Sequence, residues 1–591
     1  MILRKFVRTV SLQADNFRHS LAYIDALPQL TILGAVVGLC TGAIIILFRF
    51  CIIAPLSFLP EHADNFEALT VTTRIALIFV GAIALIITLQ LFDKNHWETS
   101  VAHVLDRLHS HQGKLPGKNW LLQFLGATIA LITGHSVGRE GPAVHLGATA
   151  ASKLGQWLRL PHNSLHTLIG CGVAAAISAA FDTPMAGVIF ALEVLLLEYS
   201  IVGFVPIIMA SVIGAVMSQA TFGTETSFMH SQSDINSLAE LPYMIVVGLV
   251  IALFASTLIK LNLHAMKFSR YAITWRILAA AALTALVATE IPEVMGLGYD
   301  TAQKAINGEL GFDNLIFIAL GKLLLTPIII GLGIPGGIIG PLLVGGACLG
   351  GAMGVIATLA YPDLVIHLEI YVILGMVGMM AATLNAPLAA LVAVLELSYN
   401  SHMIFPAMLV IVISCVCTRH LFKLEGIFIE QLKLKGKSLK QSPAERALGK
   451  AGVRSIMDTQ FCCTPAIIDY EQAKTLLSSN PNWIVIEHEN HKTALRAAGL
   501  AVYLESASEE VLSLEKEIDL EDIPGKRSAM LPIHENATLK EALQAFANTG
   551  TNTLYVARNP LPLHSSVEGI VLRSSIENYY QPEEFKHHAV D

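Results

Sequence analysis

Two short segments of this chain have a residue pattern that could bind an anion through backbone groups. One reads GREGP over residues 138–142, and the other reads GIIGP over residues 337–341. Proline suits the first turn of a helix because its missing N–H would have no partner there, and glycine lets a ligand approach the backbone. A helix N-terminus offers free N–H donors and about half a positive charge. Two such helix starts facing one cavity would form an anion site; the alternative is that the glycines only permit close helix packing.

Glu140 places a carboxylate inside the first segment, within a charge-poor stretch. An ionisable side chain at membrane depth is costly and is a candidate for function. When ionised, this carboxylate would compete with a bound anion for the same N–H groups, and when protonated it would leave them. We therefore predict that Glu140 is a gate. The alternatives are static capping of the helix start and an ion pair with the adjacent Arg139.

An internal repeat shows how the chain positions these two segments. Residues 172–193 match residues 375–396 without a gap, in the same register from Gly172 and Gly375 to Glu193 and Glu396. Each copy also has a Gly-Pro element upstream, so the match is a strong repeat signal. Transporter halves commonly meet at a pseudo-twofold axis, with the substrate site at broken helices near the membrane centre. For the two repeat glutamates themselves we favour a structural role.

Composition restricts the class of protein. Of 591 residues, 54% are hydrophobic and 14% are charged, against roughly 25% charged in soluble domains, and the mean hydropathy is +0.60. A single soluble domain and a disordered chain are both excluded. The net charge of −8 gives no basic surface for nucleic acid. Uncharged runs predict a polytopic membrane protein; they cover residues 26–48, 75–92, 201–224, 241–259, 323–362, 370–395 and 397–418.

Charges beside these runs predict the topology. Basic residues precede the first run, and five lysines follow the last one closely, between Lys423 and Lys440. The positive-inside rule places both termini in the cytoplasm. The predicted parts are a cytosolic segment 1–27, a membrane domain 28–422 with repeats at about 28–220 and 241–422, a linker 423–452, and a soluble α/β domain 453–591. The expected location is a plasma membrane or bacterial inner membrane.

The sequence gives little support to an enzyme. None of the eight cysteines forms a CxxC pair, so no zinc site or disulfide framework is indicated, and no other cofactor is implied. An intramembrane enzyme would need a nucleophile and a base that face each other at depth. His135 and Ser136 precede Gly138, but the third member of a triad is missing.

The two segments resemble motifs of the CLC chloride channels and transporters. Residues 138–142 resemble the family's GREGP motif, residues 337–341 resemble its GxFxP motif with isoleucine for phenylalanine, and residues 425–436 resemble its SIYxxxLxxKG segment. The likeness covers about 28–436. It implies a homodimer in the lipid bilayer, with one chloride pathway per subunit on an inverted repeat of broken, tilted helices.

The resemblance also implies roles for individual residues. Glu140 would be the external gate, the amides of Ile338 and Ile339 would hold a central anion, and the amides of residues 139–141 would serve an outer site. Counting back from Gly138 puts Thr99 at the position of an anion-coordinating serine, and Phe428 stands at the position of a coordinating tyrosine. The anion-binding residues predicted in this way are Thr99, Gly138, Arg139, Gly141, Pro142, Gly337, Ile338, Ile339, Gly340 and Phe428.

Val194 departs from the exchangers of this family. They carry an inner proton-transfer glutamate at this position, and valine cannot relay a proton. The sequence therefore favours a passive, gated chloride channel, with a chloride/proton antiporter on the same fold as the alternative. Adjacent Glu193, or water, could substitute for the missing carboxylate.

The tail resembles a pair of CBS domains near residues 453–506 and 527–580. The segment 569–576 is similar to the closing motif of the second module, but Leu572 and Ser575 replace the threonine and aspartate that hold adenosine ribose in that family. We therefore predict no nucleotide binding and a role in dimer contact or gating. The alternative is a cytosolic cap that only stabilises the protein.

Overall fold

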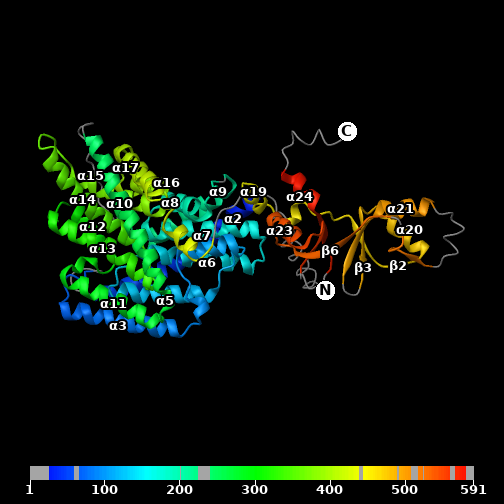
Figure 1. The fold of residues 1–591 in the computed structure, drawn as a ribbon, viewed down its shortest axis with the longest axis horizontal. Helices are drawn as coiled ribbons and strands as arrows, with labels where there is room; N and C mark the ends of the chain where they lie inside the picture. The colour runs from blue at the N-terminus through cyan, green and yellow to red at the C-terminus, as the bar shows by residue number, and fades with distance from the viewer. Residues whose placement is uncertain are drawn as a thin grey trace. The chain divides into compact units, whose positions relative to one another are not determined.

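The computed structural model describes residues 21, 26–58, 65–199, 201–223, 240–437, 443–488, 491–506, 517–523, 525–558 and 566–580. The chain divides into two compact units (Figure 1). A helical unit comprises Leu30–Trp157 and Leu165–Leu439. An α/β unit comprises Lys440–Asp591 together with Leu158–Ser164 and the segment Met1–Gln29. The predicted fold class, a polytopic helical part followed by an α/β part, is confirmed. Most of the predicted segment 1–27 lies outside the described residues.

The first repeat is built from helices of very different lengths. Its elements are α2 (Leu27–Leu56), α3 (Val71–Gln90), η1 (Lys94–His96), α4 (Val101–Ser110), α5 (Gly117–Ile132), α6 (Glu140–Trp157), α7 (His162–Phe181), α8 (Pro184–Phe190), the π-helical turn η2 (Ala191–Leu196) and α9 (Ile201–Phe222).

The second repeat follows the same plan. Its elements are α10 (Leu241–Met266), η4 (Lys267–Arg270), α11 (Ile273–Glu290), η5 (Pro292–Val294), α12 (Tyr299–Ile306), α13 (Phe312–Leu332), α14 (Ile339–Ala360), α15 (Leu368–Leu384), α16 (Pro387–Ser398), η6 (Ser401–Met403), α17 (Ile404–Val416) and the π-helical turn η7 (Cys417–Leu421); α18 (Ile427–Leu434) comes next.

Membrane-length helices alternate with short apolar ones. Among the described residues, nine helices are long and apolar enough to cross a bilayer, whereas α8, α15 and α16 are shorter than the roughly 20 residues that a crossing needs. The uncharged run 323–362 is broken in two, because α13 ends at Gly333 with a φ of 112° and α14 begins only at Ile339. A break at this depth is tolerated where protein surrounds the backbone or where it lines a cavity.

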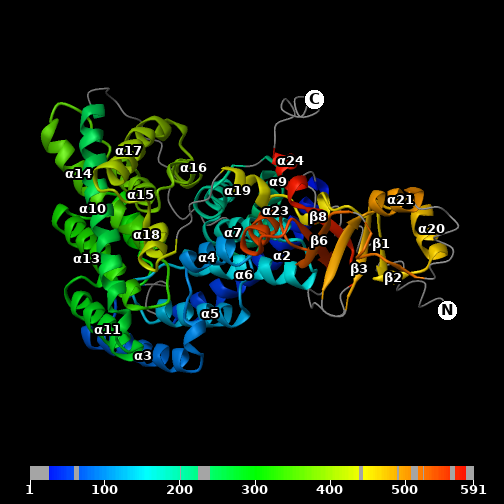
Figure 2. The same cartoon turned by 45° about the vertical axis from the view of Figure 1, so that its right-hand side comes forward.

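The two repeats interlock through helices that are distant in sequence. Helix α3 of the first repeat packs against α11 of the second, and the two lie side by side in both views (Figures 1 and 2). Helix α8 likewise packs against α16. The predicted linker 423–452 contains α18, which packs against α4 and α10 and so belongs to the helical unit.

Two glutamates fasten α8 and α16 to each other in a symmetric way. The carboxylate of Glu193, in the first repeat, accepts the N–H groups of Leu388 at 3.2 Å and Ala389 at 2.7 Å. The carboxylate of Glu396, in the second repeat, accepts those of Met185 at 2.8 Å and Ala186 at 2.7 Å. Each glutamate therefore caps the N-terminus of a helix in the other repeat, which is a structural role of the kind expected from the sequence.

The α/β unit contains two modules that share a strand-helix-strand-strand-helix order, to which the first module adds one short strand. The first consists of β1 (Phe461–Pro465), β2 (Ile467–Ile468), α20 (Tyr470–Ser478), β3 (Trp483–Glu487), β4 (Lys492–Arg496) and α21 (Ala497–Ser506). The second consists of β6 (Arg527–His534), α23 (Leu539–Thr549), β7 (Thr553–Ala557), β8 (Gly569–Leu572) and α24 (Arg573–Tyr580); α19 (Pro443–Gly449), η8 (Val453–Ser455) and β5 (Ile518–Asp519) lie outside them.

One sheet joins the two modules in the order β1-β3-β4-β6-β7-β8. In each module the first pair, β1–β3 or β6–β7, is parallel and the second pair is antiparallel. The helix after the first strand is capped alike in both modules, by a capping box at Asp469 and by another at Thr538. The modules thus share this arrangement and meet where β4 pairs with β6.

We expect replacement of Glu396 by alanine to lower the stability of the helical unit. The substitution leaves the first N–H groups of α8 without their acceptor, and loss of such a cap costs about 0.5–2 kcal/mol. Chemical or thermal unfolding in detergent measures the effect. Glu290→Ala is the matched control, because Glu290 is exposed at the C-terminal end of α11. Equal unfolding midpoints for the two variants would contradict the capping role.

Candidate anion-binding site

Backbone hydrogen bonds join the two glycine-proline segments predicted from the sequence. The N–H of Gly138 donates to the carbonyl of Gly337 at 2.7 Å, and the N–H of Gly337 donates to the carbonyl of Gly138 at 2.7 Å. This reciprocal pair is the smallest possible antiparallel bridge, and it links the two repeats at equivalent positions. The structure therefore brings together the two segments that sequence reasoning placed at one site.

A helix begins directly after each of these glycines. Helix α6 starts at Glu140 and α14 at Ile339, so Pro142 and Pro341 lie in the first turns, as the sequence predicted. The two starts nearly touch, because a Cβ atom on Gly141 would lie 2.7 Å from Cα of Gly337. Only glycine permits this approach. The first N–H groups of two helices thus point into one small region.

The Glu140 side chain is fully buried and reaches across to the other repeat. The N–H of Gly340, in the first turn of α14, donates to its Oε2 at 3.0 Å. The hydroxyl of Tyr299 donates to its Oε1. The sequence placed this carboxylate at the start of its own helix, but the structure places it at the helix start of the partner repeat. An anion is stabilised there by the free N–H groups and by the dipole of α14.

Arg139 binds a backbone carbonyl and not the carboxylate of the adjacent Glu140. Its Nη2 donates to the carbonyl of Ala180, near the end of α7, at 2.9 Å. Its guanidinium carbon lies 5.4 Å from the centroid of the Tyr299 ring. In the second repeat, Ile338 and Ile339 stand where the first repeat has Arg139 and Glu140. The site therefore combines two similar helix starts with a carboxylate residue on only one of them.

Tyr299 is a site residue that the sequence analysis missed. It begins helix α12, outside both glycine-proline segments and outside the gapless repeat. No motif points to it. Its position depends on a loop, residues 293–296, whose four carbonyls accept hydrogen bonds from the fully buried Nζ of Lys322 at 3.1–3.4 Å. The available signal was Lys322, a charged residue within the apolar stretch 315–332, which needs polar partners at that depth.

Thr99 and Phe428 lie on elements that pack together. Thr99 is half-buried just before α4, and Phe428 is buried in the first turn of α18. Helix α18 packs against α4. Ion pairs fix this contact, with Lys435 Nζ 2.8 Å from Glu98 Oε1 and Lys437 Nζ 2.7 Å from Asp106 Oδ2. The structure thus brings the elements of these two predicted residues together, while their part in anion binding stays a prediction.

A match to a protein-family model identifies the family of this chain. The model of the voltage-gated chloride channels matches residues 80–419, which include both helix starts and Glu140. The chain belongs to this CLC family. Its members are channels and transporters rather than enzymes, in agreement with the prediction from the sequence.

A curated relative and two solved structures agree with this assignment, and the solved structures share the fold. The H(+)/Cl(−) exchange transporter ClcA of Vibrio cholerae serotype O1 (strain M66-2) is 28% identical over 309 residues, which is 50% of this chain and 66% of that protein, just under two thirds. A slow cyanobacterial Cl−/H+ antiporter has a TM-score of 0.60 at 20% identity, over 69% of this chain and 97% of its own. A eukaryotic CLC transporter has a TM-score of 0.59 at 15% identity, over 94% and 99%.

Val194 lies at the position where the CLC resemblance implies an inner proton relay. It is 5% exposed, within the π-helical turn η2. The neighbouring Glu193 carboxylate is held at the start of α16. The residue that could replace the missing relay is therefore already bound to a helix end.

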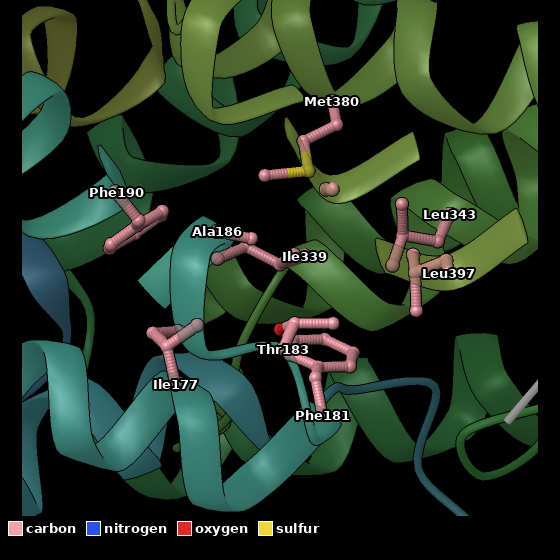
Figure 3. A pocket seen from close by; sticks show the side chains of 10 residues that line it. Ile177, Phe181, Thr183, Ala186, Phe190, Ile339, Leu343, Met380 and Leu397 are labelled. Atoms are coloured by element: carbon pink, nitrogen blue, oxygen red, sulfur yellow. The ribbon is translucent and has the colours of Figure 1, made fainter. Parts of the chain in front are cut away.

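An apolar cavity lies beside Ile339, between the repeats (Figure 3). Its volume is about 30 Å³, enough for one water molecule. Its lining is almost wholly apolar, with Thr183 as the polar exception; the lining residues are Ile177, Phe181, Thr183, Ala186, Phe190, Ile339, Leu343, Met380, Ala393 and Leu397. Water needs two or more polar partners to be held in such a space.

The pair of residues considered for an intramembrane enzyme has no catalytic geometry. The Oγ of Ser136 lies 2.9 Å from Oγ1 of Thr326. His135 is fully buried, and neither of its ring nitrogens has a hydrogen-bond partner. The part of the chain that the structure describes also contains no cluster of three or more potential metal ligands.

We expect Gly138→Ala to destabilise the site. A Cβ atom on Gly138 would overlap Oε2 of Glu140 and would lie 2.9 Å from the N atom of Gly340. Overpacking of this kind costs roughly 1–3 kcal/mol, so the thermal unfolding midpoint in detergent should fall. Gly203→Ala is the matched control, because a Cβ atom there meets nothing within 4 Å. An unfolding midpoint as high as that of the control would show that the site is looser than described.

Proposed function

We propose that this chain transports chloride, or a similar small anion, across a membrane in exchange for protons. The observation that carries this proposal is the Glu140 carboxylate bound at the start of α14, where it accepts the N–H of Gly340. The donors that hold this carboxylate are the kind that bind a halide. The proposed anion position and the carboxylate therefore use the same donors.

This competition couples anions to protons. An ionised Glu140 occupies the helix start and excludes the anion. A protonated Glu140 has lost the charge that the dipole of α14 stabilises, so it yields the place to an anion. The site thus holds either an ionised carboxylate or a bound anion, and a proton is taken up or released at each exchange. A protonatable group in the anion path is the minimal device for coupled transport.

The comparisons support exchange over passive conduction. The curated relative from Vibrio cholerae is named as an exchange transporter. Because 66% of its length is matched, its activity supports the proposal without defining the function of this chain.

Passive, gated chloride conduction is the second candidate. Val194 favours it, since valine at the inner relay position cannot carry a proton, and the apolar lining of the cavity beside Ile339 offers few partners to a water chain. In an exchanger, the inner half of the proton path must therefore avoid residue 194.

We further propose two anion positions along the path. The amides of Ile338 and Ile339, with Thr99, would serve a central position, and the backbone of residues 139–141 would contribute to an outer one. At the central position Phe428 lacks the hydroxyl of a tyrosine, a difference of about 0.5–1.5 kcal/mol for one hydrogen bond.

The α/β unit supports the proposal of a CBS-like pair. Apart from the short strand β2, its two modules share one element order, and they join through β4 and β6, as two related copies of one small domain would. Together with the CLC resemblance, this leads us to propose a homodimer in a plasma or bacterial inner membrane, with both termini cytoplasmic and the pair acting in dimer contact or gating.

We expect chloride flow to drive protons uphill in the opposite direction. Proteoliposomes with a chloride gradient, monitored at once for chloride and for external pH, measure this coupling. Exchange predicts a fixed ratio of protons to chloride ions. Chloride flux without proton movement would establish the passive channel instead.

Glu140→Gln is the control for the coupling experiment, because it keeps the shape of the side chain and removes its charge. Chloride flux through this variant should be high and nearly independent of external pH, whereas wild-type flux should rise on acidification. Proton movement should be lost. A variant that keeps the wild-type pH profile would show that Glu140 is only a static cap.

We expect no saturable binding of ATP or AMP by the full-length protein. Leu572 and Ser575 replace the threonine and aspartate that hold ribose in nucleotide-binding CBS modules, although a hollow lined by Asp458, Arg496 and Leu572 lies in the α/β unit. Calorimetric titration of the detergent-solubilised protein measures this directly. Micromolar binding would show that other residues replace the missing contacts.

A further inference from the structure

We propose that the hydroxyl of Tyr299 is a donor shared by the gate and the anion. It holds the ionised Glu140 carboxylate at the start of α14, and it then binds the anion that replaces this carboxylate. The inference rests on the proposed anion transport and adds a side-chain ligand to the outer anion position.

The hydroxyl and the N–H of Gly340 converge on one place. Tyr299 donates to Oε1 of Glu140, and Gly340 donates to Oε2. A Cβ atom on Gly340 would lie 3.2 Å from the hydroxyl oxygen of Tyr299 and 3.0 Å from Oε2 of Glu140. The phenol is therefore beside the helix start itself. When the carboxylate leaves, both donors remain aimed at the vacated position.

The surroundings fix the phenol in this position. Lys322 binds the four carbonyls of residues 293–296, and the N–H of Gly296 donates to the carbonyl of Gly134 at 3.3 Å. Gly298, with a φ of 76°, then turns the chain into α12. A Cβ atom there would lie 2.6 Å from Nζ of Lys322. The turn thus requires glycine at position 298. Because α12 begins directly after this turn, the turn sets the position of the Tyr299 ring next to Glu140.

A phenol hydroxyl suits both occupants chemically. It donates one hydrogen bond and carries no charge, so it stabilises a carboxylate or a halide without trapping either as a cation would. The central position has lost such a donor through Phe428, whereas the outer position has one from Tyr299. The tyrosine hydroxyl of this site, that of Tyr299, therefore lies at the outer position, which Glu140 and the anion occupy in turn.

Other charged groups around the gate have partners of their own. Arg139 donates to Ala180, and Lys304 of α12 pairs with Glu67 and Asp300. Lys322 is bound to carbonyls. The first turn of α14 has no titratable side chain. Other titratable residues on the neighbouring elements include His135, Asp182, Glu293 and His145, and His145 hydrogen-bonds to His103 at 2.9 Å.

Tyr299→Phe removes the donor and keeps the ring, and two measurements test its role. Loss of one hydrogen bond to a charged group changes an equilibrium constant, here for protonation or for anion binding, by about a factor of ten. The first measurement is chloride flux against external pH in proteoliposomes. An ionised Glu140 that is less well held is protonated more easily, so half-maximal flux should shift to higher pH by about one unit. The second is calorimetric chloride titration of Glu140→Gln with and without Tyr299→Phe, which should weaken binding about tenfold.

Tyr243→Phe is the matched control. Tyr243 is a buried tyrosine whose hydroxyl donates to the carbonyl of Met353 at 2.8 Å. The Tyr243→Phe variant should unfold more easily, while the pH dependence of its chloride flux and its chloride affinity should stay unchanged. An unchanged pH midpoint, or unchanged chloride affinity in the Glu140→Gln background, would overturn the inference. Absence of chloride flux in the wild type would overturn the proposed function instead, and the calorimetric comparison would still decide the role of Tyr299.

Discussion

The reciprocal hydrogen bonds between Gly138 and Gly337 are the constraint on which the site depends. They use only backbone atoms, so they fix the relative position of two helix starts without any side chain. Each helix brings N–H groups that its own backbone cannot satisfy. Once the starts are held together, those donors must be satisfied by something else, and Glu140 does so for Gly340. The position of the proposed gate follows from the need to satisfy helix ends at membrane depth.

The same need is met differently at α8 and α16. There the glutamates Glu193 and Glu396 cap helix starts of the opposite repeat symmetrically, with two N–H groups each. At the candidate anion site, the Glu140 carboxylate accepts one hydrogen bond from a helix start, at Gly340, and one from the hydroxyl of Tyr299. Symmetric capping fastens the repeats to each other. The single carboxylate at the other location is the one that, in the proposed function, yields its place to an anion.

Much of the fold was predictable because the repeat and the glycine-proline segments are local patterns. They identified both helix starts, the break in the run 323–362 and the candidate Glu140. The sequence could not show that this carboxylate reaches the other repeat, because that depends on the pairing of backbones far apart in the chain. Tyr299 was missed for the same reason. A loop held by Lys322 brings it to the site, and no short motif encodes such a contact.

The two helix starts are alike in backbone but unlike in charge, since Ile339 stands where the first repeat has Glu140. An inverted repeat turns its two halves toward opposite faces of a membrane. With Glu140 as the proposed gate, the site therefore differs between its two sides, because only the first repeat supplies a titratable group. Vesicles in which the protein is inserted in both directions contain two populations that respond unequally to acid on one side. Orientation thus becomes an experimental variable that must be fixed before the two faces can be compared.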